Sequence, residues 1–281
     1  MEPGGTSAAD DERAGELCAE VSRGLLGDFA PALLLLSEAE RRRAQAFLAY
    51  ACALFGYARQ PRGESERLAQ ITYWELTLEE ALAGHAGDTG GHPVFLRMAR
   101  EQKRRPWPQA GLTGLGACAR RRAAAARPAT PEEAEAGAEE LGRAAATVLL
   151  GAPPPGEVTT FASALIRLRT LQVLGAEIRD KRCPIPVSEL PDGPEEDDAP
   201  GPLIAAVQRE CQRLRPRLLR GPRGLVSLPP GYRRAAMFSL LASLRLITQL
   251  EDGGEELLRT PPRLGVLSRI GLLTRARWFP V

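Results

Sequence analysis

The chain has 281 residues, of which 44% are hydrophobic and 26% are charged. This composition supports a sizeable buried core and excludes a chain that is disordered throughout. The formal net charge is only +2. The two basic clusters, at 103–105 and 120–122, are interpreted as solvated helix ends, so no nucleic-acid partner is expected.

The cysteine and histidine contents argue against a disulfide framework and against a zinc site. The five cysteines include no C-x-x-C pair, and the two histidines, His85 and His92, have no cysteine near them. Scattered thiols of this kind indicate a reducing compartment, and we expect a cytoplasmic location.

The sequence predicts no targeting peptide and no membrane span. Residues 1–16 are acidic and lack the apolar stretch of a signal peptide. The longest apolar runs, at 29–36 and 46–55, are shorter than the ~20 residues that a membrane-spanning helix needs. Peripheral contact with a membrane surface stays open.

Apolar residues recur with a helical period from end to end, and no stretch alternates with a period of two. The expected fold class is therefore all-α. Ser37 and Glu40 have the spacing of a capping box, which predicts a helix from there to about Ala58. Further helices are predicted over 11–28, 64–84, 93–104, 108–125, 131–150, 157–181, 202–219, 230–250 and 263–277.

Three segments rich in Pro and Gly, at 151–156, 191–202 and 220–224, predict breaks between helices. None is long enough to demand a domain boundary. The expected organisation is a flexible N-terminus over residues 1–10 and a single helical domain over residues 11–281. The acidic run at 195–198 is flanked by prolines and is interpreted as a solvated loop, not a metal motif.

Four groups of motifs follow one another along the chain. They are FGYAR (55–59); RLAQITYWELTLEEALAG (67–84) with GHPVFLRMA (91–99); SALIRLRTLQVLGAEIRD (163–180) with PIPVSEL (184–190); and LPPGYRRAAMFSLLASLRLITQLEDGG (228–254). In this order they resemble the squalene/phytoene synthase family, all-α enzymes that join two prenyl diphosphates head to head. The resemblance implies an isoprenoid-synthase-type helical bundle around a central cavity, with two aspartate-rich helices facing each other across it.

In that family the aspartates hold magnesium, a hard ion that bridges carboxylates to substrate phosphates and stabilises the leaving diphosphate. The first family motif has the form Arg-x-x-Asp-Asp-x-x-Asp. Counted from Arg59, its three aspartate positions fall on Arg62, Gly63 and Glu66. Only Glu66 can bind a cation, and Pro61 interrupts the helix that would align the ligands.

The second motif is assessed by projecting residues 161–180 as one continuous helix, at about 100° per residue. The apolar arc comprises Phe161, Leu165, Leu168, Leu171, Gly175 and Ile178. On this projection Gln172 and Arg179 turn inward, whereas Glu177 and Asp180 turn away.

Matching the family's Leu-Gln start to residues 171 and 172 places its inward asparagine on Gly175 and its inward aspartate on Arg179. A guanidinium about 4 Å from a divalent ion would be repelled by roughly 8 kcal/mol at an effective dielectric constant near 20. No magnesium and no other metal is therefore expected at this position. The arginine could instead contact an anion or a neighbouring carboxylate.

The leading hypothesis is a pseudoenzyme that keeps the helical shell of the family and has lost magnesium-diphosphate catalysis. It would need no cofactor. It would bind a prenyl lipid or prenyl diphosphate, or act as a scaffold for a protein partner, as is thought of the phytoene-synthase-like assembly factors of respiratory complex I. The predicted anion-binding residues are Arg59, Arg62 and Arg179, and the predicted cavity-lining residues are Phe55, Tyr57, Leu168, Leu171, Gln172 and Gly175.

Two alternatives stay open. The first is an active magnesium-dependent prenyltransferase that condenses polyprenyl diphosphates with displaced ligands. Its catalytic carboxylates would be drawn from Glu64, Glu66, Glu177 and Asp180, and they would have to converge on one cavity. The second is a purely structural helical protein whose resemblance to the family is accidental.

Overall fold

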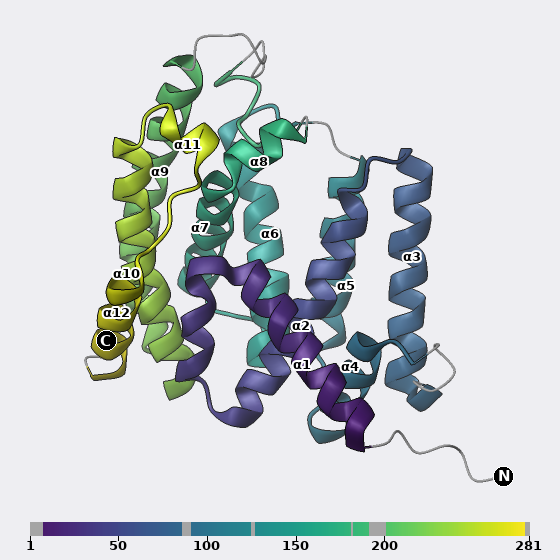
Figure 1. Ribbon diagram of the computed structural model, residues 1–281. Coiled ribbons are helices and arrows are strands. Elements are labelled where there is room, and N and C mark those ends of the chain that lie inside the picture. The colour runs from purple at the N-terminus through teal and green to yellow at the C-terminus, as the bar shows by residue number, and fades with distance from the viewer. Residues whose placement is uncertain (1–7, 86–90, 125–126, 181, 191–200, 279–281) are drawn as a thin grey trace, which may run out of the picture. The chain divides into compact units, whose positions relative to one another are not determined.

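The computed structural model describes residues 8–85, 91–124, 127–180, 182–190 and 201–278. Within these ranges every regular element is a helix (Figure 1), so the predicted all-α class is confirmed. The helices group into two compact units. Unit 1 comprises residues 1–124 and 147–152, and unit 2 comprises residues 125–146 and 153–281.

The predicted domain organisation stays a prediction. The single domain expected over 11–281 is not tested by the grouping of helices into units. Most of the N-terminus that was expected to be flexible, residues 1–7, lies outside the described residues, as does the acidic run at 195–198.

Unit 1 is a bundle whose helices closely match the predicted ones. Its described elements are α1 (Ala8–Leu26), the 3-10 helix η1 (Gly27–Leu35), α2 (Glu38–Ala58), α3 (Glu64–Glu80), the π-helical turn η2 (Ala81–His85), α4 (Pro93–Arg104) and α5 (Gln109–Ala124). Its largest fully buried side chains are Phe47, Tyr50, Leu54, Ile71, Phe95, Met98 and Leu115.

Two of these helices begin where side chains satisfy their free backbone N–H groups. The Ser37 hydroxyl accepts from the Glu40 N–H, and the Glu40 carboxylate accepts from the Ser37 N–H at 3.0 Å, which confirms the predicted capping box. At α4, His92 Nδ1 accepts from the Val94 N–H at 3.3 Å, and Pro93 occupies the first turn. His92 is therefore a capping residue.

Unit 2 contains the remaining helices. Its described elements are α6 (Pro131–Leu150, whose last residues group with unit 1), α7 (Gly156–Gln172), α8 (Leu174–Arg179), α9 (Gly201–Leu225), α10 (Pro230–Asp252), α11 (Glu256–Arg259) and α12 (Val266–Trp278). Its largest fully buried side chains are Leu168, Ile185, Leu218, Leu225 and Phe238.

The break predicted at 220–224 is wrong, because α9 continues through this segment although it contains Pro222. In this segment the backbone of α9 comes close to α7. A Cβ atom on Gly221 would come within 2.7 Å of the Phe161 ring. Burial against α7 offsets the hydrogen bond that proline removes from the helix.

The single helix predicted over 157–181 is also interrupted. It ends at Gln172, since Val173 has φ −104° and ψ 14°, and α8 begins at Leu174. Residues beyond this interruption no longer follow the rotation of α7. Any projection that treats residues 161–180 as one helix therefore misplaces the side chains of its second half.

Both apolar runs noted in the sequence lie in unit 1 and contribute to its core. The run at 29–36 forms most of η1, where Phe29 and Leu33 are buried, and the run at 46–55 belongs to α2. Among the described helices, none combines the length and the apolar character that crossing a membrane requires.

Gly175 allows the backbone of α8 to contact the backbone of α11. A Cβ atom at this position would lie 2.9 Å from the carbonyl carbon of Leu258, in contact with the backbone and not with a flexible side chain. We therefore expect Gly175→Ala to lower the free energy of unfolding by about 1–3 kcal/mol, as overpacking does. Chemical denaturation followed by circular dichroism measures this change.

Gly56→Ala is the matched control, since an added Cβ on this exposed residue of α2 meets nothing within 4 Å. This variant is expected to stabilise the protein by about 0.5–1 kcal/mol, because alanine loses less backbone entropy than glycine in a helix. Equal effects of the two substitutions would contradict the close approach at Gly175.

Candidate functional site

The residues of the first predicted motif lie at the surface of unit 1. Helix α2 ends at Ala58, and the half-buried Arg59 follows as its C-cap. Arg62 is exposed in the connection to α3, and Glu64 and Glu66 are exposed in the first turn of α3. At a helix N-terminus these carboxylates interact favourably with the helix dipole, which accounts for their position without a metal ion.

The residues of the second motif lie in unit 2 and differ from the projection. Glu177 is buried, with 4% of its surface exposed, and accepts a hydrogen bond from Arg182 Nε at 3.1 Å. Arg179 is exposed and donates to the Leu258 carbonyl at 3.2 Å. Asp180 is exposed and forms an ion pair with Arg182. The predictions that Arg179 turns inward and that Glu177 turns outward are both wrong, because the helix is interrupted at Val173.

The four carboxylates of the active-enzyme alternative are therefore in unlike environments. Glu64, Glu66 and Asp180 face solvent, and Glu177 is neutralised by an adjacent arginine. In the ranges that the structure describes, no three His, Cys, Asp or Glu side chains are grouped as metal ligands would be. The anion-binding roles of Arg59, Arg62 and Arg179 stay predictions.

The residues predicted to line a cavity pack against protein where the structure shows their surroundings. Gln172 Nε2 donates to the Pro262 carbonyl at 2.9 Å, and Gln172 Oε1 accepts from Arg169 at 2.8 Å. Leu168 and Leu171 are buried, and Gly175 faces the α11 backbone as described above. On α2, Phe55 and Tyr57 are half-buried, and the Tyr57 ring lies edge-on to Trp74 at 5.4 Å.

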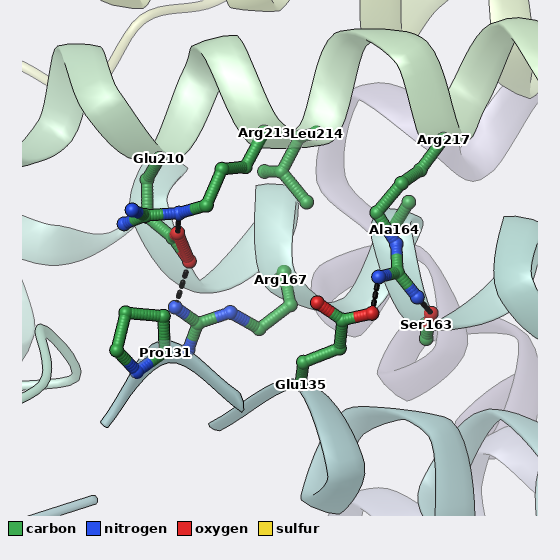
Figure 2. Close-up of a pocket in the computed structure, with 9 residues that line it drawn as sticks. All are labelled: Pro131, Glu135, Ser163, Ala164, Arg167, Glu210, Arg213, Leu214 and Arg217. Carbon is green, nitrogen blue, oxygen red and sulfur yellow. Dashed lines mark hydrogen bonds and ion pairs between the residues drawn. The ribbon is translucent and has the colours of Figure 1, made fainter. Parts of the chain in front are cut away.

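Unit 2 contains a small cavity between α6, α7 and α9 (Figure 2). Its volume of about 20 Å³ is room for one water molecule. The lining residues are Pro131, Glu135, Ser163, Ala164, Arg167, Glu210, Arg213, Leu214 and Arg217.

Ion pairs between helices occupy the space around this cavity. Arg167 of α7 pairs with Glu210 of α9, and Glu210 also accepts from Arg213 Nε at 3.0 Å. Arg217 pairs with Glu135 of α6 (Figure 2). These ion pairs connect α6, α7 and α9. The cavity between them, at about 20 Å³, is too small for a prenyl substrate.

Unit 1 contains a much larger space, a groove of about 540 Å³. Helices α3 and α5 form its sides, and α2 and η2 contribute one residue each. The apolar lining residues are Leu76, Leu78, Leu82 and Leu112, and the polar ones are Tyr50, Thr72, Glu75, Glu79, Gln109, Thr113 and Arg120. We refer to these residues as the α3–α5 groove.

The charged groups of the α3–α5 groove carry a net negative charge. Glu75 forms an ion pair with Arg120. Burial raises the pKa of the Glu75 carboxyl, Arg120 opposes this shift, and the neighbouring Glu79 adds to it. Burial also raises the pKa of Tyr50, so its phenol is neutral at physiological pH. Two glutamates and one arginine line the groove, so its formal charge is negative by one.

An aromatic cluster holds Tyr50 in place behind the groove. Trp74 stacks on Tyr50 with ring centroids 6.3 Å apart, and it also contacts Phe95 at 4.3 Å and His92 at 5.1 Å. Burial lowers the pKa of His92, so the ring beside Trp74 favours its neutral form. Tyr50 thus lines the groove from a packed aromatic cluster.

The sequence contains a local pattern for the α3–α5 groove and another for the cavity of unit 2. Glu75 and Glu79 are spaced i, i+4 on α3 and therefore share one helix face, which also carries leucines. In unit 2, Arg167 stands among apolar residues of α7, as expected of an arginine that has a buried partner. Their partners, Arg120 and Glu210, are distant in sequence and could not be identified without the fold.

Comparison with protein-family models finds no match, and no curated protein matches the sequence. Solved structures do match. A dehydrosqualene synthase in complex with a ligand is similar over 96% of this chain and 97% of its own, with a TM-score of 0.74 and 13% identity.

Two further structures agree with it. Squalene synthase HpnC from Alicyclobacillus acidocaldarius is similar over 91% of this chain and 98% of its own, with a TM-score of 0.68 and 17% identity. The complex of TcSQS with the ligand BPH1237 is similar over 94% of this chain and 86% of its own, with a TM-score of 0.69 and 10% identity. Identities this low show the fold alone, and the predicted isoprenoid-synthase-type fold is thereby confirmed.

Proposed function

We propose that this protein uses the squalene synthase fold to bind a neutral prenyl lipid, and that it does not catalyse magnesium-dependent diphosphate chemistry. The α3–α5 groove supports the proposal. Its volume of about 540 Å³ lies within the range of roughly 300–1,000 Å³ that small-molecule sites occupy. The isoprenoid class of ligand is taken from the dehydrosqualene and squalene synthases that share the fold.

The polarity of the groove favours a prenyl chain with an uncharged head group. Four leucines supply an apolar wall, and the side chains of Gln109 and Thr113 can hydrogen-bond a hydroxyl or carbonyl group. A diphosphate would meet Glu75 and Glu79, and the one arginine of the groove is already paired with Glu75. Like charges at close range disfavour that ligand.

The surroundings of the motif residues support the absence of magnesium chemistry. A magnesium ion that bridges two phosphates needs carboxylates in one place. Here Glu64 and Glu66 face solvent on α3, Asp180 faces solvent after α8, and Glu177 is paired with Arg182. The residues at these positions do not fit a magnesium site.

The test is binding of farnesol and farnesyl diphosphate to the purified protein by isothermal titration calorimetry, in the presence of magnesium. We expect farnesol to bind at least about tenfold more tightly than its diphosphate, and no diphosphate to be released. Thr113→Trp places a large side chain in the groove from an exposed position on α5. This variant is expected to weaken farnesol binding by about tenfold or more.

Thr248→Trp is the matched control, since Thr248 is an exposed residue of α10 in unit 2 and does not line the groove. It should bind farnesol as the unmodified protein does. If farnesol bound equally to both variants, the groove would not be the site. Release of diphosphate in proportion to protein concentration would instead contradict the loss of magnesium-diphosphate chemistry.

A further inference from the structure

Helix α12 exposes apolar side chains on one face. Of the ten large hydrophobic side chains that are exposed in the described residues, four belong to this 13-residue helix. Val266 is 64% exposed, Leu267 85%, Ile270 55% and Trp278 70%. Such a concentration on one short helix differs from the isolated exposed leucines of an ordinary surface and indicates a binding surface.

The opposite face of α12 is fixed to the rest of unit 2. Leu272 and Ala276 are buried, and Figure 1 shows α12 alongside α10. At about 100° per residue, Leu267, Ile270 and Trp278 fall within about 80° of one another, away from the buried pair. The exposed apolar residues therefore point outward together, and we call Val266, Leu267, Ile270 and Trp278 the α12 face.

The sequence that leads into α12 and forms it is basic. From residue 257 to residue 281 the sequence contains five arginines and no aspartate or glutamate; the arginines are Arg259, Arg263, Arg269, Arg275 and Arg277. Arg275 and Arg277 are exposed and adjoin Trp278. The ion pairs found among the described residues include neither of them, so both charges are available to an external anion.

We propose that the α12 face binds the surface of an anionic membrane, with the helix lying in the plane of the interface. An amphipathic helix that combines leucine, isoleucine and tryptophan with arginine inserts its apolar side below the head groups while the guanidinium groups contact lipid phosphates. Nucleic acid would use the arginines but would gain nothing from the exposed Leu267 and Ile270. With 13 residues the helix lies on the bilayer and does not span it.

The test is sedimentation of the full chain with vesicles of phosphatidylglycerol and phosphatidylcholine, compared with vesicles of phosphatidylcholine alone. We expect binding to the anionic vesicles that weakens as salt is raised, since salt screens the arginines. The double variant Leu267→Gln, Ile270→Gln should reduce binding by about tenfold or more. Arg275→Gln with Arg277→Gln should also reduce it, by about fivefold for each arginine.

Tyr73→Gln is the matched control, because Tyr73 is 62% exposed but lies on α3 in unit 1, and this variant should bind vesicles normally. Trp278 supplies an independent readout. Brominated lipids should quench its fluorescence, and this quenching should be lost in Trp278→Phe, since Trp74 and Trp107 are buried.

Failure to sediment with vesicles of either composition would overturn the proposal. So would binding that survives the leucine and isoleucine substitutions. Retention on single-stranded DNA that depends on Arg275 and Arg277 alone, without vesicle binding, would assign the surface to a nucleic acid. None of these outcomes bears on farnesol binding to unit 1.

Discussion

Replacing Glu210 with alanine is expected to lower the free energy of unfolding by about 3–5 kcal/mol. Glu210 is 4% exposed and Arg167 is 9% exposed, so both charges of this ion pair have left water. Removing the carboxylate leaves the Arg167 guanidinium buried, with a hydrogen bond to the Pro184 carbonyl at 3.5 Å and no carboxylate from Glu210 beside it. The desolvation cost of that uncompensated charge is the source of the loss.

The expected loss is the cost of leaving one buried charge without its partner, and it is not the net contribution of the intact ion pair to stability. When both charges are removed together, as in Arg167→Leu with Glu210→Leu, apolar side chains replace them between α7 and α9. Such replacements are often neutral or stabilising, so the double variant should recover most of the stability lost by Glu210→Ala. A double-mutant cycle from urea denaturation, followed by circular dichroism, measures the coupling.

Gln212→Ala is the control on the same helix, because Gln212 is exposed on α9 and lies outside the cavity lining. It should change the stability by no more than about 0.5 kcal/mol. If Glu210→Ala had an equally small effect, water would have to reach Arg167, and the buried pair between α7 and α9 would be contradicted. A double variant less stable than Glu210→Ala would show that the two charges are not coupled as described.

The positions of most helices could be predicted because their signals are local. The capping box at Ser37 and the proline at position 93 fix helix starts through contacts within one turn, and apolar periodicity identifies the rest. The continuation of α9 through Pro222 could not be predicted in this way. It depends on the contact between Gly221 and Phe161, which are 60 residues apart in sequence.

The candidate site was harder to predict than the fold, for a related physical reason. The order of motifs was sufficient to identify the fold, which does not depend on any one side chain. The direction of Glu177 and Arg179, by contrast, depends on a local interruption at Val173 that has no proline or glycine to mark it. Because of this one non-helical residue, the projection places Arg179 inside and Glu177 outside, whereas the structure has Glu177 buried and Arg179 exposed.

The same limit applies to the α3–α5 groove. Its apolar and acidic residues on α3 share a helix face that the sequence does show, but the groove exists only because α5 lies opposite that face. The distance between α3 and α5 cannot be predicted from the sequence that connects them. A cavity is a property of packing between elements, and helical periodicity reports only on the elements themselves.

Replacing Arg43 with alanine is expected to destabilise unit 1 by about 3 kcal/mol or more. Arg43 is a buried residue of α2, with 4% of its surface exposed. Its guanidinium donates to the carbonyl oxygens of Arg105 at 2.6 Å, Pro106 at 2.9 Å and Glu101 at 3.4 Å. It also lies 3.6 Å from the centre of the Trp107 ring, in a cation–π contact.

These acceptors lie at the C-terminal end of α4 and just beyond it, and the Glu101 carbonyl also accepts from the Arg105 N–H at 3.0 Å. A single guanidinium satisfies several of them at once, because its donors form a planar fork, and its charge is favourable at the negative end of the helix dipole. Alanine would remove these hydrogen bonds together with the cation–π contact and would open a cavity beside the buried Trp107. Lysine would keep the charge but has one donor centre, so Arg43→Lys should restore only part of the lost stability.

Arg41→Ala is the control, since Arg41 precedes Arg43 by two residues on α2, is half-buried, and makes none of these contacts. It should alter stability by no more than about 0.5 kcal/mol. Urea denaturation of the three variants, followed by tryptophan fluorescence and by circular dichroism, gives the comparison. Full recovery in Arg43→Lys would contradict the role of the planar fork, because charge alone would then account for the stability. Equal stability of Arg41→Ala and Arg43→Ala would contradict the capping of α4 by Arg43 altogether.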